Sequence, residues 1–125
     1  ISPEESLILC REGRKRGVNM ILTHPEFPRT RIGRDDQAEL AKLGVVIEKN
    51  WVNLAQKSVM PEEMAETIRT VGSGHVYLAT DRGQKGAPTP VSELKRFIAV
   101  MLTCGIAEAQ IRDMVQKVPE EIVCR

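Results

Sequence analysis

The chain has 125 residues, of which 42% are hydrophobic and 28% charged, and its formal net charge is +1. This length and composition are typical of one folded domain with a real core, and they exclude a disordered chain. The near-neutral charge, with one Trp, one Tyr and two Phe, gives no case for nucleic acid or a membrane surface as partner.

The predicted elements alternate between helix and strand along the chain. Each helix start is marked by a cap residue or a proline, including a capping box at Ser2 and Glu5 and another at Asp36 and Glu39. Glycines or a proline mark the helix ends. We expect helices over residues 2–17, 36–44, 61–72, 89–104 and 107–119. We expect strands over residues 18–25, 45–50 and 75–80.

The predicted strands begin at regular intervals, 27 and then 30 residues apart. They are rich in Val, Ile and Leu, and a helix follows each one. This pattern predicts parallel βαβ units whose sheet is covered on both faces. Since no linker-like segment interrupts the chain, we expect residues 1–125 to form a single domain.

The sequence gives no sign of secretion, of a membrane span or of a cysteine-based site. Cys10, Cys104 and Cys124 are far apart, and no Cys-x-x-Cys pair is present. No apolar run reaches the roughly 20 residues of a membrane span, and no secretory signal opens the chain. We therefore expect a cytoplasmic protein. Because the chain lacks an initiating Met, we also expect it to be part of something longer.

Each predicted strand ends on a side chain that can bind a metal. His24 follows MILT, Glu48 lies late in VVIE, and Asp81 follows VYLAT. The carboxyl ends of parallel strands share one rim, which is where α/β proteins place their working residues. Imidazole and carboxylate ligands suit zinc, with manganese or iron as alternatives. We therefore expect a divalent metal site at His24, Glu48 and Asp81.

Each of these residues also has an interpretation without function. His24 before Pro25 is consistent with a simple strand end, Glu48 with a solvated partner of Lys49, and Asp81 with a turn. The second histidine is a useful contrast. His75 opens its strand and lies about 20 Å from the carboxyl rim, at ~3.3 Å per residue, so it is not expected to join the site.

The motifs ILTHP, GVVIEKN and LATDRGQ, followed by residues 93–122, resemble the C-terminal half of metal-dependent hydrolases of the amidohydrolase superfamily. Those proteins are (β/α)8 barrels with one or two divalent metals. The resemblance implies that Asp81 ends the eighth strand and binds metal or handles the proton of the activated water. It makes His24 a ligand and Glu48 either a ligand or a carboxylate that supports one. The paired His-x-His is absent, and Val118-Pro119 stands where the family has Asn-Pro.

The expected fold is therefore α/β: a partial (β/α)8 (TIM-type) barrel with about three parallel strands and flanking helices. A whole barrel takes about 250 residues, so roughly half is expected to lie outside this chain. The expected function is hydrolysis of a small molecule, such as a cyclic amide, ester or lactone, by a divalent-metal-activated water. Zinc is the first choice of metal, and Asp81 is the catalytic residue. Arg82 and Gln84 are expected substrate contacts.

The alternative is a non-catalytic half-barrel that binds a partner or a second copy. Strands that are apolar on both faces leave an uncovered inner face, and Ile21, Val46, Ile47 and Leu78 cannot all find partners there. This interpretation predicts a homo-oligomer or association with a missing N-terminal half.

Overall fold

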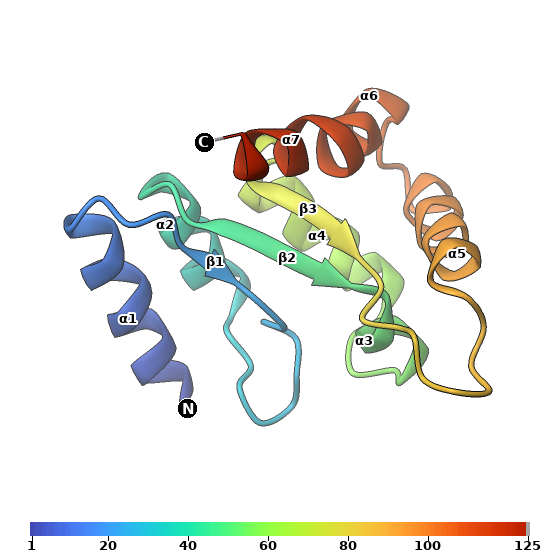
Figure 1. Ribbon diagram of the computed structural model, residues 1–125, viewed down its shortest axis with the longest axis horizontal. Helices are drawn as coiled ribbons and strands as arrows, with labels where there is room; N and C mark the ends of the chain where they lie inside the picture. The colour runs from blue at the N-terminus through green and yellow to red at the C-terminus, as the bar shows by residue number, and fades with distance from the viewer. Residues whose placement is uncertain (125) are drawn as a thin grey trace.

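Three parallel strands form one open sheet in the order β1–β2–β3, as the helix–strand alternation predicted (Figure 1). The computed structural model describes residues 1–124. The strands are β1 (Ile21–Leu22), β2 (Val46–Asn50) and β3 (Val76–Ala79). In register, Ile21 pairs with Val46 and Glu48 pairs with Tyr77. The protein is thus an α/β structure in which β2 is the central strand.

Helices flank the sheet, and α2 and α4 lie together behind it in the view of Figure 1. Helix α1 packs beside β1, while α5 and the C-terminal helices pack against β3. The longer helices are α1 (Pro3–Lys15), α2 (Arg34–Lys42), α4 (Pro61–Val71) and α5 (Pro90–Thr103). The shorter ones are α3 (Trp51–Ala55), the 3₁₀ turn η1 (Ser73–His75), α6 (Glu108–Arg112), the π-helical turn η2 (Asp113–Lys117) and α7 (Val118–Val123).

The helix starts agree with the sequence at α1 and differ at α2. The Ser2 Oγ accepts from the Glu5 amide at 3.2 Å, and Glu5 accepts from the Ser2 amide at 2.7 Å, which confirms the first capping box. The capping box predicted at Asp36 is wrong. Helix α2 already begins at Arg34, and its N-cap Gly33 makes no side-chain capping bond.

The end of the chain also differs from expectation. Pro119 was expected to end the last helix, but it lies at the start of α7 and the helical path continues to Val123. A proline inside a helix removes one backbone donor and crowds the preceding turn. The π-helical turn η2 directly precedes it and widens the helix there, which accommodates the ring.

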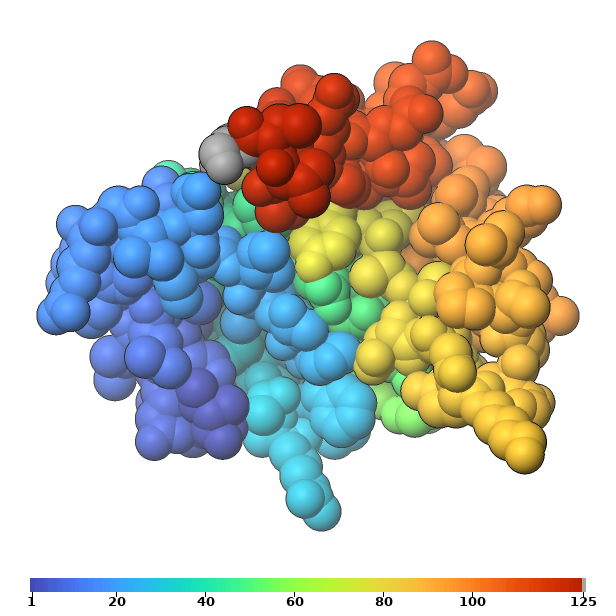
Figure 2. Space-filling view, viewed as in Figure 1, coloured from blue at the N-terminus to red at the C-terminus, as the bar shows by residue number. Residues whose placement is uncertain are grey.

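The two faces of the sheet differ in burial. The side chains facing α2 and α4, here called the helix-facing side, are all buried: Leu22, Ile47, Lys49, Val76 and Leu78. The opposite face, here called the open side, carries Ile21, Val46, Glu48, Asn50, Tyr77 and Ala79. Of these, only Asn50 is fully buried. Figure 2 shows atoms of β2 and β3 in green and yellow at the surface, between the N-terminal and C-terminal helices.

The open side is not the wholly apolar surface that the sequence suggested. Ile47 and Leu78 are buried on the helix-facing side, so only Ile21 and Val46 remain as apolar side chains of the expected four. Nearer the carboxyl rim, Glu48, Asn50 and Tyr77 make the face polar. The alternation of side chains along β2 explains this, because residues 46, 48 and 50 share one face.

Candidate site at the carboxyl rim of the sheet

His24 and Asp81 meet at the carboxyl rim, although they follow the two outer strands of the sheet. The His24 Nε2 lies 3.7 Å from the Asp81 Oδ2, and the side chains are 34% and 48% exposed. His24 comes just after β1, and Asp81 comes just after β3. The parallel topology predicted that these residues would share a rim, and the structure brings them into a pair.

Both residues have an unusual backbone conformation. His24 has a φ of 56° and Asp81 a φ of 51°, in the left-handed region that is uncommon for residues other than glycine. Such conformations cost of order 1–3 kcal/mol and gather at functional sites. Lys57 shares the conformation at an exposed turn, so the φ angle alone indicates little. Two such residues whose side-chain atoms approach to 3.7 Å are a stronger indication of a functional site.

A chain of hydrogen bonds on the open side holds the His24 ring. The Asn50 Nδ2 lies 2.9 Å from the His24 Nδ1 and donates to the Glu48 Oε1 at 2.8 Å. The Tyr77 hydroxyl donates to the other Glu48 oxygen. Glu48 therefore reaches His24 through Asn50, and the network crosses from β3 through β2 to the residue after β1.

Sequence reasoning missed Asn50 and Tyr77. One sequence signal could have found Asn50, since residues 48 and 50 of one strand share a face. Tyr77 lies beside Glu48 through the register of β2 and β3, which the sequence does not show. Burial raises the pKa of Tyr77 well above its ordinary value, and the hydrogen bond and charge of Glu48 raise it further. Tyr77 therefore stays a neutral donor to Glu48 throughout the physiological pH range.

The orientation of the Asn50 amide determines which ring nitrogen of His24 carries the proton. With the amide donating to Nδ1, the ring proton lies on Nε2 and faces Asp81. If the amide is turned over, its Oδ1 accepts from Nδ1–H and leaves Nε2 free to bind an ion, and the bond that Asn50 donates to the Glu48 Oε1 is then lost. In the present orientation the buried Asn50 Oδ1 has no hydrogen-bond partner among residues 1–124.

A cavity of about 370 Å³ opens beside the His24–Asp81 pair. Leu22 and Phe27 give it apolar walls, and the tilted Phe27 ring lies 5.7 Å from the His24 ring, measured between centroids. Ser6, Thr23 and Thr30 add hydroxyl groups. This volume lies near the lower end of the range typical for small-molecule sites.

Arg82 and Gln84, the expected substrate contacts, hold the loop after β3 in the structure. The Arg82 Nε lies 3.3 Å from the Glu93 Oε2, and the Trp51 indole donates to the same oxygen. Gln84 donates to the backbone carbonyl of Asp81 at 3.5 Å. Glu93 is only 2% exposed and was not recognised in the sequence. A substrate contact from Arg82 or Gln84 stays a prediction.

The histidines and carboxylates do not form a three-ligand cluster. Within residues 1–124, no group of three His, Cys, Asp or Glu side chains is arranged to hold a metal ion. Glu48 is bonded to Asn50 and Tyr77, so its role as a direct ligand stays a prediction. His75 lies exposed just before β3, at the far end of the sheet from Asp81, as expected.

Comparison with known proteins gives one partial match. Residues 1–48 match the model of a family described as "Family of unknown function (DUF6282)", which covers α1 to β2 and includes His24 and Glu48. No curated protein and no solved structure matches the chain. Among residues 1–124, no helix combines the length and apolar character needed to span a membrane.

Proposed function

We propose that the carboxyl rim is part of the active site of a metal-dependent hydrolase, with His24 and Asp81 as two of the ligands. The observation that carries the proposal is the contact between these residues from opposite edges of the sheet. The parallel order β1–β2–β3 supports a further proposal, that this chain is part of a (β/α)8 barrel. In such barrels consecutive strands are neighbours and the site lies at their carboxyl ends.

The geometry of the pair fits a shared ion. Two donors that each bind one ion at about 2.0–2.2 Å lie at most about 4.4 Å apart. The 3.7 Å between His24 and Asp81 falls within that limit. Nitrogen and carboxylate donors suit zinc, manganese or iron. Glu48 stays a predicted third ligand, and any other ligand would come from outside residues 1–124.

The proposal gives the residues of the network separate roles. A bound divalent ion supplies Lewis-acid activation and lowers the pKa of water toward about 7. Asp81 would accept a proton from a water at this rim and pass it to the leaving group. In the ion-bound form the Asn50 amide is turned over, so that its Oδ1 accepts from the His24 Nδ1–H and holds the ring, while Glu48 keeps Tyr77 as its donor. The adjoining cavity takes a small neutral substrate, for which a cyclic amide, ester or lactone is our proposal.

Titration calorimetry with zinc and with manganese tests the proposal directly. We expect His24→Ala and Asp81→Asn each to weaken binding at least tenfold, because each removes one of two ligands. His75→Ala is the matched control, since it removes the chain's other histidine from the far end of the sheet. Equal affinity in the parent and in both site variants would remove the basis for the metal site.

A second candidate function, association with another chain, is favoured by the apolar part of the open side. Ile21 is 40% exposed, and β1 is an edge strand of the sheet that residues 1–124 form. We expect sedimentation to show association of the chain, weakened by Ile21→Lys. Val91→Lys is the control, because Val91 is more exposed and lies on α5, which packs against β3 at the other edge of the sheet from β1. A monomer unaffected by either change would contradict this candidate.

A further inference from the structure

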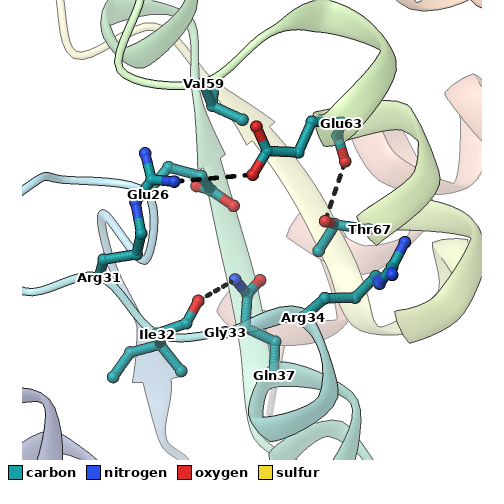
Figure 3. A pocket seen from close by; sticks show the side chains of 9 residues that line it. All are labelled: Glu26, Arg31, Ile32, Gly33, Arg34, Gln37, Val59, Glu63 and Thr67. Carbon is teal, nitrogen blue, oxygen red and sulfur yellow. Dashed lines mark hydrogen bonds and ion pairs between the residues drawn. The ribbon is translucent and has the colours of Figure 1, made fainter.

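A second cavity, of about 200 Å³, lies on the helix-facing side, where two of its lining residues, Glu26 and Gln37, bond to Lys49 of β2 (Figure 3). It lies between the loop after β1, the start of α2, and α4. Its walls are mostly polar, although it is close to the core. Its lining residues are Glu26, Arg31, Ile32, Gly33, Arg34, Gln37, Val59, Glu63 and Thr67.

One wall of this cavity is a buried polar network. The Lys49 side chain is completely buried and donates to the Glu26 Oε1 and, at 2.5 Å, to the Gln37 Oε1. The Gln37 amide in turn donates to the Ile32 carbonyl at 2.8 Å. These bonds fix Glu26, which is 6% exposed, against β2 and α2.

Glu26 keeps one acceptor without a donor. Its Oε2 is buried and has no hydrogen-bond partner among residues 1–124. In Figure 3 the Glu26 carboxylate points toward the middle of the cavity, between Arg31 and Gln37. Buried carboxylate oxygens are almost always paired, because an unpaired one loses its hydration without compensation. This oxygen can therefore accept from a further N–H or O–H donor, either water or a ligand.

The opposite wall of the cavity, at the start of α2, favours a negatively charged group. Helix α2 is nine residues long, and its N-cap Gly33 supplies no side-chain acceptor. Gly33 and Arg34 both line the cavity. The free N–H groups of a helix start, together with the helix dipole, favour an anion. Arg34 and Arg31 add positive charge at the mouth, where they lie 3.8 Å from Glu66 and 3.6 Å from Glu63.

We propose that this cavity binds a small zwitterion of the amino-acid class. Its ammonium group donates to the Glu26 Oε2, and its carboxylate lies at the start of α2 beside Arg34. A simple anion would meet the carboxylates of Glu26 and Glu63, and a simple cation would meet the helix start and two arginines. A volume of about 200 Å³ equals about six or seven water molecules, which suits glycine or alanine.

Titration calorimetry on the whole chain tests this with four probes: glycine, L-alanine, acetate and methylammonium. We expect one molecule of glycine or L-alanine to bind per chain, and each single-charge probe to bind at least tenfold more weakly. Comparable binding of acetate or methylammonium would overturn the proposal, as would no binding of either amino acid at about 10 mM.

Two variants tie binding to the cavity. Glu26→Gln removes the acceptor charge, and Arg34→Gln, at an exposed position, removes the charge beside the helix start; each should weaken glycine binding at least tenfold. Arg29 is an exposed arginine in the loop that carries Glu26, and it does not line the cavity, so Arg29→Gln should leave glycine binding unchanged. If Glu26→Gln fails to fold, Arg34→Gln decides alone. Unchanged binding in Arg34→Gln would place the ligand elsewhere and overturn the proposal.

Discussion

On the helix-facing side of β2, Lys49 is completely buried, with Glu26 and Gln37 as partners. On the open side, its neighbour Glu48 is only half-buried and bonds to Asn50 and Tyr77. Two neighbouring residues of one strand thus place one charged side chain in the core and the other in the hydrogen-bond network of the open side. The comparison shows how one strand supports the fold on one face and orients a candidate site on the other.

The largest effect should come from breaking the pair on the helix-facing side. Glu26→Ala leaves the Lys49 ammonium buried without its carboxylate, and we expect the free energy of unfolding to fall by about 3–5 kcal/mol. Urea denaturation followed by circular dichroism measures this. The double variant Glu26→Leu with Lys49→Met should recover most of the loss, because it replaces both charges by apolar groups. Glu48→Gln should cost less than about 1.5 kcal/mol, and a cost equal to that of Glu26→Ala would break the comparison.

A second buried carboxylate extends the comparison to the loop after β3. Trp51→Phe removes the indole N–H that donates to Glu93, which is 2% exposed. We expect the free energy of unfolding to fall by about 1–3 kcal/mol, since Glu93 loses a donor in a buried setting. Urea denaturation followed by circular dichroism gives the value. Arg82 lies 3.3 Å from the same carboxylate, so Arg82→Met combined with Trp51→Phe should cost more than either change alone.

On the open side, Tyr77 should report the charge of Glu48. Tyr77 is the only tyrosine in the chain, so an absorbance titration follows this single group. Its pKa is raised by burial and by Glu48, so it should ionise well above the ordinary value of about 10. The stability that it contributes is fully present below that ordinary value and is lost as pH rises through the folded-state pKa.

Replacing Glu48 by Gln should lower the pKa of Tyr77, because the neighbouring negative charge is removed. Part of the upward shift should persist, since burial is its largest cause. An unchanged titration in Glu48→Gln would mean that the Tyr77–Glu48 contact does not form in solution.

The smallest effect concerns the strained rim. Asp81→Gly puts glycine at a φ of 51°, where it is unstrained, so stability should stay within about 1 kcal/mol of the parent or rise. Asp35→Gly, at an exposed site in α2, should instead lower stability by about 0.5–1 kcal/mol. Thermal unfolding of the two variants, side by side, distinguishes these cases. A large loss in Asp81→Gly would show that the carboxylate is needed for folding.

The sequence predicted the parts of the structure that depend on local pattern. Strands rich in Val, Ile and Leu with helices between them led to the parallel sheet, and its topology led to His24 and Asp81 on one rim. The local sequence pattern could not show which residues lie next to each other on neighbouring strands. Tyr77 depends on a register that only tertiary packing sets, and the start of α2 at Arg34 depends on how the preceding loop packs.

Of the residues that sequence reasoning missed, Lys49 is the one whose burial was easiest to predict. It lies two positions after Ile47, so alternation alone places it on the buried side of β2. Its partners could not be read in the same way, because Glu26 and Gln37 come from a loop and a helix at sequence separations of 23 and 12 residues. The same holds for Glu93, whose partner Trp51 lies 42 residues earlier.

The anchoring of Arg82 to Glu93 has a consequence for motion. Residues 83–86 beyond the anchor are exposed, and Gly83 and Gly86 have φ values of 143° and 84° that favour glycine. Exposed glycine-containing segments typically reorganise on nanosecond to microsecond timescales. Because the anchor lies one residue after Asp81, such fluctuations can proceed without displacing the carboxylate. Amide hydrogen exchange should therefore change sharply within this loop, fast beyond the anchor and slow in β3 before it.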